Sequence, residues 1–380
     1  MDRLNPSQTR RHESLRRVSA RDGQGTTSRL GPVAQLPQVI RDLGFTPSQV
    51  LADTGFDEAY FADPDMPIPY ATGARLLAHC ADETGCEHLA LLLGEKAGPG
   101  ALGLAGLLLM SADSVGSALT DLVRHFELHD RGGLPRLDQR GDTALIGFVV
   151  VEPAVAAPEL LYDLAMTLAC NIMRSLCGPT WNPTEVLLPR RRPADAKPWE
   201  KFFRAPVRFS APECALAFPA IWLAHPVPVA NPLLHQHLEK QAVEWRDHQP
   251  ASSFPGEIRR LIHGTMTQER CSADRISQLL GINVRTLNRR LQAEATTFKA
   301  LRQEVLYEVA QELLSTTALD LNQVASLLGY AEASSFIHAF SRWSGHTPQH
   351  WRRAIERPHR GVVDEASGHP ATDRSVKPRT

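Results

Sequence analysis

A seven-residue pattern that occurs twice constrains the C-terminal part of this chain more than any other feature. The segment ISQLLGI at 276–282 recurs 48 residues later as VASLLGY at 324–330. Each copy places a small residue, Ser277 or Ala325, ahead of a Leu-Leu-Gly run. The small residue lets two helices cross closely, and glycine adopts the positive φ of a tight turn at little steric cost. The pattern therefore predicts two helix-turn-helix units, at 273–292 and 321–343.

The second helix of each unit is expected to present a polar outer face. Apolar i, i+4 pairs, Leu287 with Leu291 and Phe336 with Phe340, would bury the inner face. The remaining side chains are of types that bind base edges or phosphates. We predict DNA contacts from Arg285, Thr286, Asn288, Arg289 and Gln292 in the first unit, and from Glu332, Ser334, Ser335, His338 and Arg342 in the second.

A plain helical bundle held together by glycine turns and leucine pairs is the alternative reading of this region. Two copies of one unit, joined by a single long helix predicted over 298–314, argue against it.

The distribution of charge along the chain also favours a DNA-binding C-terminal region. The 380 residues have a net charge of −1, but residues 31–254 carry 17 basic and 26 acidic side chains, whereas residues 255–357 carry 13 and 10. Such asymmetry points to nucleic acid at the basic end.

Periodicity and turn residues divide the chain into five segments. The ends are expected to be disordered, and two folded domains are expected on either side of a connecting helix. The expected segments are an extension at 1–30, an α+β domain at 31–230, a connecting helix and linker at 231–253, an all-α domain at 254–355 and a tail at 356–380. Within the α+β domain we predict helices at 70–84, 113–127 (with Asp113 as N-cap) and 158–177, and strands at 143–151, 185–189, 207–209 and 215–219.

The C-terminal hundred residues resemble the DNA-binding domain of AraC/XylS-type transcription regulators. The resemblance rests on INVRTLNRRLQAEATTFKAL (282–301), EVAQELL (308–314) and LNQVASLLGYAEASSFIHAFSRWSGHTPQHWR (321–352). The acidic body is similar, less closely, to the arabinose-regulator-type effector domain of that family, in LGLAGLLLMSADSVGSAL (102–119) and FFRAPVRFSAPECALAF (202–218).

The resemblance implies a sequence-specific DNA-binding transcription regulator, specifically an effector-responsive activator. Its N-terminal domain would be sensory, and its all-α domain would join two helix-turn-helix motifs by a long linker helix. The implied partners are double-stranded promoter DNA, RNA polymerase, an unknown small-molecule effector and a second copy in a homodimer. Three positions depart from the family pattern. Leu306 stands where the linker helix usually carries arginine, Ala295 where glycine is usual, and His338 where a basic or polar residue is common.

The rival hypothesis is a small-molecule-processing enzyme in the N-terminal domain with the helical module as an appendage. GPGALG at 98–103 matches a dinucleotide-binding pattern, but it lacks the strand-to-helix context that the pattern requires. The group His79, Cys80, Cys86 and His88 lacks the paired spacing of structural zinc sites. Walker, GxSxG and HExxH motifs do not occur. We therefore expect no enzymatic activity, no cofactor and no metal.

The number of cysteines and the length of the apolar segments indicate the cellular compartment of the protein. Six scattered cysteines are too few for a disulfide scaffold. The apolar, charge-free run at 97–112 is shorter than the roughly 20 residues that a membrane span needs. We expect a cytoplasmic protein with no membrane contact.

Overall fold

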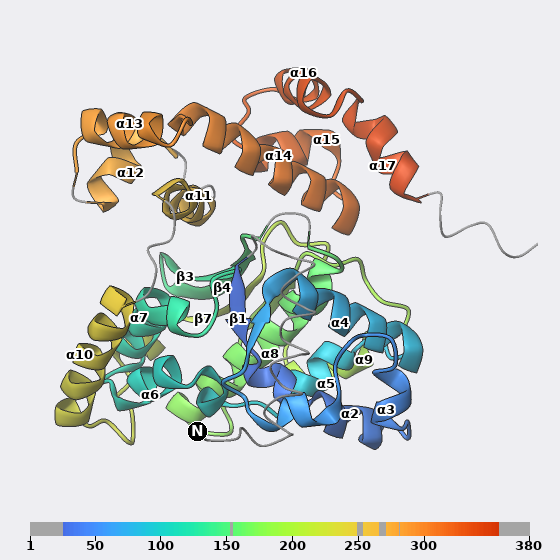
Figure 1. The fold of residues 1–380 in the computed structure, drawn as a ribbon, viewed down its shortest axis with the longest axis vertical. Coiled ribbons are helices and arrows are strands. Elements are labelled where there is room, and N and C mark those ends of the chain that lie inside the picture. The colour runs from blue at the N-terminus through green and yellow to red at the C-terminus, as the bar shows by residue number, and fades with distance from the viewer. Residues whose placement is uncertain (1–25, 153–154, 249–253, 266–270, 281, 357–380) are drawn as a thin grey trace, which may run out of the picture.

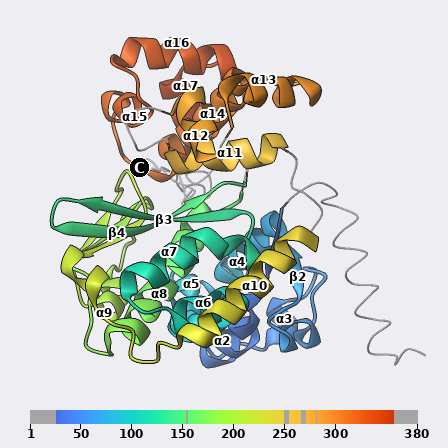
Figure 2. The same ribbon diagram turned by 90° about the vertical axis from the view of Figure 1, so that its left-hand side faces the viewer.

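The computed structural model describes residues 26–152, 155–248, 254–265, 271–280 and 282–356 (Figure 1). The expected linker at 249–253, most of the expected N-terminal extension and nearly all of the expected tail lie outside these described residues, as does Gly281. An N-terminal α+β body occupies one side of the molecule, and an all-helical module lies over one face of its sheet (Figures 1 and 2).

A five-stranded sheet with strand order β3-β4-β7-β5-β6 forms the centre of the N-terminal body. Neighbouring strands are antiparallel except for the parallel pair β5 and β6. The strands are β3 (Gly133–Arg140), β4 (Thr143–Val150), β5 (Glu185–Leu188), β6 (Val207–Phe209) and β7 (Ala215–Pro219). Arg140 pairs with Thr143, so Gly141 and Asp142 form a two-residue hairpin in which Gly141 has a φ of 61°. Glycine is favoured in such turns because they require positive φ.

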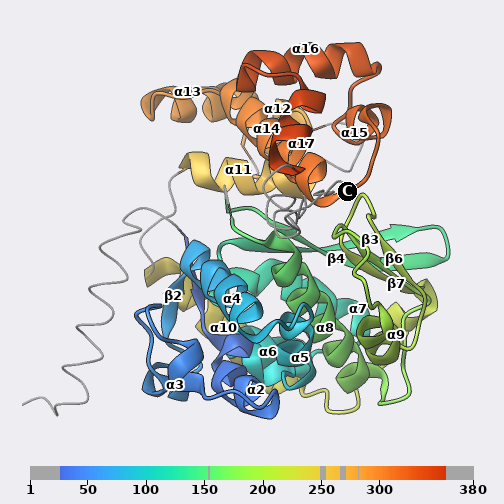
Figure 3. The ribbon, with the colours of Figure 1, turned by 90° about the vertical axis from the view of Figure 1, so that its right-hand side faces the viewer.

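Helices cover the face of the sheet that points away from the helical module (Figure 3). These helices are α2 (Leu36–Asp42), α3 (Pro47–Val50), α4 (Tyr70–Thr84), α5 (Leu89–Glu95), α6 (Leu104–Ser111), α7 (Val115–His125), α8 (Pro158–Cys177) and α9 (Lys197–Phe203). Alternate β4 side chains, Ile146 and Phe148 among them, join the main core with α6, α7 and α8. Leu160 and Leu164 of α8 also join a second core among α2 to α5, so α8 links the two.

Three expectations need correction at the level of elements. The extension expected over 1–30 does not run to residue 30, because Thr27–Arg29 forms strand β1, which pairs with β2 (Pro67–Pro69), and Leu30 is fully buried. Ser114, not Asp113, is the N-cap of α7: its hydroxyl accepts from the Ser117 amide and completes a capping box. Strand β3 was not predicted, since its Gly, Pro and charged residues hide the pattern.

The connecting helix α10 (Pro232–His248) packs along α6. The Asn231 side chain caps it by accepting from the Leu234 amide at 3.0 Å. By length and composition, α8 is the one helix among the described residues that could cross a membrane. However, 67% of its most apolar window is buried, as expected of a core helix.

Seven helices make up the C-terminal module, consistent with the helical pattern of its sequence. They are α11 (Phe254–Thr265), α12 (Ala273–Leu279), α13 (Val284–Ala293), α14 (Phe298–Thr316), α15 (Leu321–Leu327), α16 (Ala333–Ser344) and α17 (Pro348–Glu356). The long helix α14 contributes Leu301 and Val305 to a core with α11, α12 and α13. Its second half contributes to a separate core with α15, α16 and α17. One helix therefore holds both halves of the module.

The module contacts the N-terminal body through α11 and α14. Helix α11 packs on β3, and the Tyr162 hydroxyl of α8 donates a hydrogen bond to the Glu312 carboxylate of α14. Beside this contact lies a junction cavity of about 820 Å³, including its open part, lined by both bodies. Val150 and Glu152 line it from one side, and Glu308 and Trp351 from the other.

Candidate functional site

The first helix-turn-helix unit consists of α12 and α13. Ser277 is 2% exposed at the place where the two helices meet, so a small side chain is required there. Asn283 starts α13 by accepting from the Thr286 amide at 2.8 Å. Leu287 and Leu291 are fully buried, which fixes the rotation of α13 about its axis.

The second unit consists of α15 and α16 and repeats this construction. Asp320 caps α15 in a capping box with Gln323. Ala325 occupies the close crossing point at 1% exposure, and Gly329 takes the turn with a φ of 77°. Phe336 and Phe340 are fully buried and fix the rotation of α16.

The opposite faces of α13 and α16 carry the predicted contact residues. Both helices lie on the side of the module that faces away from the N-terminal sheet, a placement on which all three views agree (Figures 1, 2 and 3). The side chains exposed on these faces are Arg285, Asn288, Arg289, Gln292, Glu332, Ser334, Ser335, His338 and Arg342. Thr286 is half-buried, and Ser334 is held by Glu332, whose carboxylate accepts from its hydroxyl at 3.1 Å. The predicted set therefore forms two accessible polar faces.

Two of the departures from the family pattern have a structural explanation. Leu306 is 3% exposed in the core beneath α15 and α16, so this position points inward in this chain. Ala295 has a φ of 55°, a left-handed conformation that glycine adopts more easily than alanine. The turn between α13 and α14 therefore keeps its geometry at a conformational cost.

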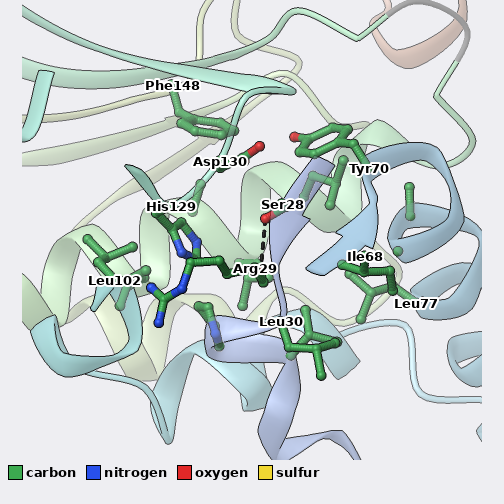
Figure 4. A pocket seen from close by; sticks show the side chains of 18 of the residues that line it. Ser28, Arg29, Leu30, Ile68, Tyr70, Leu77, Leu102, His129, Asp130 and Phe148 are labelled. Atoms are coloured by element: carbon green, nitrogen blue, oxygen red, sulfur yellow. Dashed lines mark hydrogen bonds between the residues drawn. The ribbon is translucent and has the colours of Figure 1, made fainter. Parts of the chain in front are cut away.

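A second candidate site is an apolar cavity in the N-terminal body (Figure 4). Its volume is about 620 Å³, including the part open to solvent. Strand β1, the loop before α6, and helices α4 and α8 all contribute to its wall. The wall includes Leu30, Ile68, Ala74, Leu77, Leu102, Phe126, Phe148, Leu161, Leu164, Ala165 and Leu168.

Polar groups gather at two places in this cavity. The Arg29 guanidinium lies beside the His129 ring, and the oxygens of Tyr70 and Asp130 point toward one another (Figure 4). Arg29 also forms an ion pair with Asp65. Burial lowers the pKa of His129 to about 3, with Arg29 adding to the effect, so the ring is neutral at physiological pH. His129 Nδ1 has no hydrogen-bond partner among the described residues, which leaves it available to a ligand.

No sequence pattern predicts this cavity, because its residues come from separated segments with ordinary apolar patterns. The histidines and cysteines near residue 80 and the glycine-rich segment 98–103 make ordinary structural contacts. His79 Nε2 lies 2.9 Å from the Val50 carbonyl oxygen, and Cys80 and Cys86 are buried free thiols. Segment 98–103 forms a short turn leading into α6, as its sequence suggested.

Both bodies match known protein families. Residues 44–227 match the model of the arabinose-binding N-terminal domain of AraC transcription regulators, and residues 276–354 match a helix-turn-helix domain model. The chain belongs to the AraC family of transcription regulators.

Two relatives found by sequence agree with this placement in the AraC family. The chain is 26% identical over 320 residues to the HTH-type transcriptional regulator VirS of Mycobacterium tuberculosis, covering 83% of this chain and 93% of the relative. It is 26% identical over 269 residues to the ornithine utilization regulator of Pseudomonas aeruginosa, covering 70% and 78%. A crystal structure of the transcriptional regulator CdpR from Pseudomonas aeruginosa matches with a TM-score of 0.38 and 23% identity, covering 82% of this chain and 97% of that one. This AraC-family chain is a DNA-binding transcription regulator.

Proposed function

We propose that this AraC-family regulator is an effector-responsive activator that binds its effector in the N-terminal cavity and promotes transcription with RNA polymerase at its promoter. In this proposal residues 31–230 bind the effector and dimerise, residues 231–253 connect, and residues 254–355 bind DNA. The observation that carries the proposal is that one helix, α8, both lines the cavity and contacts α14.

Helix α8 gives the cavity a route to the DNA-binding module. Leu161 and Ala165 line the cavity, and Tyr162 between them bonds to Glu312. A ligand that packs against the Leu161 and Ala165 side chains would shift the preferred position of α8. Because α14 holds both helix-turn-helix units, a change at Tyr162 reaches both. A ligand shifts such an equilibrium by its difference in affinity for the two states.

The cavity wall suggests the effector's chemical class. Most of the wall is aliphatic or aromatic, and the polar groups are a neutral imidazole, a phenol, a carboxylate, a serine hydroxyl and the Arg29 guanidinium, which is paired with Asp65. We infer a small, mainly apolar molecule that carries one hydrogen-bonding group. A histidine with a pKa of about 3 is a poor general base near neutral pH, which supports binding without turnover. Recovery of the ligand unchanged after incubation with the protein would test that point.

Exposed apolar side chains support a homodimer. Leu233 of α10 is 81% exposed and Ile221 is 80% exposed, and Val229 and Val243 are also exposed. Large exposed apolar side chains are often found where proteins associate. We propose that the dimer contact of residues 31–230 extends onto α10 of the connecting segment and that the dimer works in the cytoplasm. Light scattering over a concentration series, with Leu233→Glu as the variant, tests this part.

Filling the cavity tests the effector site. We expect Ala165→Phe to abolish effector-dependent transcription from a reporter while specific DNA binding is retained. Melting of the full chain with a panel of small aliphatic and aromatic alcohols, amides and acids should show ligand stabilisation in the wild type only. A ligand present at about 100 times its Kd stabilises the folded protein by about 2.7 kcal/mol. Ala62→Phe, at an exposed position outside the cavity, is the control. Equal ligand responses in Ala165→Phe and the wild type would refute the assignment.

A further inference from the structure

Three metal-ligating side chains meet where the connecting helix packs on the N-terminal body, away from the cavity and from α13 and α16. Asp121 comes from α7, and His235 and Glu239 come from consecutive turns of α10. One ligand atom of each lies within 4.8 Å of the other two. We propose that Asp121, His235 and Glu239 bind a divalent transition-metal ion of the Zn²⁺ class.

The hydrogen bonds of His235 determine which ring nitrogen faces the cluster. Nδ1 lies 3.1 Å from Ser111 Oγ and 3.3 Å from the Leu108 carbonyl oxygen. Ser111 Oγ donates its own proton to that carbonyl at 2.9 Å, and a carbonyl can only accept. Nδ1 therefore carries a proton, and in the neutral ring Nε2 directs a lone pair toward Asp121 Oδ2, 3.5 Å away. Metal-binding histidines are typically oriented by a hydrogen bond from their other ring nitrogen.

Asp121 supplies a buried oxygen that lacks a partner. Its side chain is 8% exposed, and its Oδ2 accepts no hydrogen bond from the described residues. The Glu239 carboxylate faces the same point, so three acceptor atoms converge there. Arg124 approaches Glu239 at 3.6 Å with a side chain that is 59% exposed, which places its charge on the solvent side. His235 compensates the buried Asp121 carboxylate only when its ring is protonated, and a metal ion would supply that positive charge directly.

The donor set indicates the class of ion. Imidazole suits zinc and its neighbours in the first transition row, and carboxylates complete such sites. Ligand atoms in a tetrahedral zinc site lie about 3.3 Å apart, given bonds of about 2.0–2.1 Å. Glu239, whose side chain is 40% exposed, can close the remaining distance by rotation and leave a position for water. The bound ion would fasten α10 to α7, immediately before the chain enters the DNA-binding module.

Calorimetric titration of the metal-stripped, full-length protein with Zn²⁺ tests the site. We expect one ion per chain in the wild type and binding at least tenfold weaker in Glu239→Gln and His235→Ala. Ser111→Ala, which removes a partner of Nδ1, should weaken binding about tenfold. His237→Ala removes an exposed histidine of the same helix and should leave affinity unchanged.

A parallel titration with Co²⁺ distinguishes this cluster from the cysteines. Binding at the cluster gives visible d–d bands without thiolate charge-transfer bands. If His235→Ala fails to fold, Glu239→Gln still tests the site, because the Glu239 side chain is partly exposed and the change keeps its shape. Zn²⁺ binding that is equally tight in Glu239→Gln overturns the proposal. Lack of Zn²⁺ binding by the wild type also overturns it and leaves an imidazolium–carboxylate pair.

Discussion

The Tyr162 hydroxyl donates a hydrogen bond to the Glu312 carboxylate and thereby joins a core helix of the N-terminal body to the long helix of the DNA-binding module. Tyr162 is 3% exposed, and Glu312 is half-buried at the edge of the junction cavity. Hydrogen bonds to charged groups contribute more to stability than average ones, about 1.5–3 kcal/mol.

Removing this hydroxyl should loosen the junction. We expect Tyr162→Phe to raise amide hydrogen exchange in the second half of α14, because Glu312 loses its donor. Tyr60→Phe removes a hydrogen bond to the Pro67 carbonyl at 2.6 Å within the N-terminal body, and it should leave α14 unchanged. Unaltered α14 protection in Tyr162→Phe would show that the bond does not couple the two bodies.

The same contact predicts a pH dependence. Burial raises the pKa of Glu312 to about 7, Glu159 adds to the rise, and the Tyr162 hydrogen bond opposes it. Because this pKa exceeds the ordinary value of 4.5, the stabilisation is complete below about pH 4.5 and is lost as pH rises through about 7.

The full chain should therefore melt at a lower temperature at about pH 8 than at about pH 6, with a Glu312 contribution on the order of 1 kcal/mol. Glu312→Gln should show a smaller difference. Burial also raises the pKa of Asp163 to about 7, but Asp163 is present in both proteins, so its contribution cancels in the comparison. A Gln variant with the full wild-type pH dependence would contradict this assignment.

Arg190 should be essential for stability. It pairs with Asp163, which is fully buried, and with Glu87 at 2.8 Å, and its guanidinium lies 4.6 Å from the centre of the Trp199 ring. Arg190→Ala leaves the Asp163 carboxylate buried without a counter-charge, which typically costs about 3–5 kcal/mol. Urea denaturation measures the loss. Arg192→Ala breaks an exposed pair with Glu200 and should cost less than about 1 kcal/mol.

The turn before α14 should gain stability from glycine. Ala295→Gly relieves a left-handed alanine and should stabilise the module by about 0.5–1 kcal/mol in thermal denaturation. The matched control is Ala293→Gly at the end of α13, where glycine replaces a helical alanine and should destabilise by up to about 1 kcal/mol. Equal losses in both variants would rule out strain at Ala295.

Base recognition should divide between the two units. Arg289→Ala should cost about 1–3 kcal/mol of DNA affinity and relax sequence preference in one half of the site. Changes at Ser334 and His338 should act on the other half, about ten base pairs away if α13 and α16 enter successive major grooves. Arg290→Ala removes the same charge from α13, but Arg290 lies over the Phe254 ring, so its effect on preference should be small. A footprint confined to one groove would show that α16 is structural.

Sequence periodicity predicted those parts of the fold that depend on local pattern. Helix 158–177 and strand 215–219 have the predicted bounds, because apolar spacing and nearby Gly or Pro mark them. The outward faces of α13 and α16 were predictable too, since an i, i+4 apolar pair fixes helix rotation. Strand β3 depends on pairing with β4 and was missed. The cavity and the Asp121–His235 cluster join residues that are distant in the sequence, and no local pattern marks either.

The sharing of α14 by both helix-turn-helix units has a consequence for the promoter. A single rigid rod sets the separation of α13 and α16, and the two carry different side chains, arginine and asparagine on one and serine and histidine on the other. If both helices bind DNA as predicted, one chain recognises an asymmetric DNA sequence with a fixed internal spacing. Inverting that sequence would then reverse the chain's orientation on the duplex, and with it the end of the chain that faces the start of transcription.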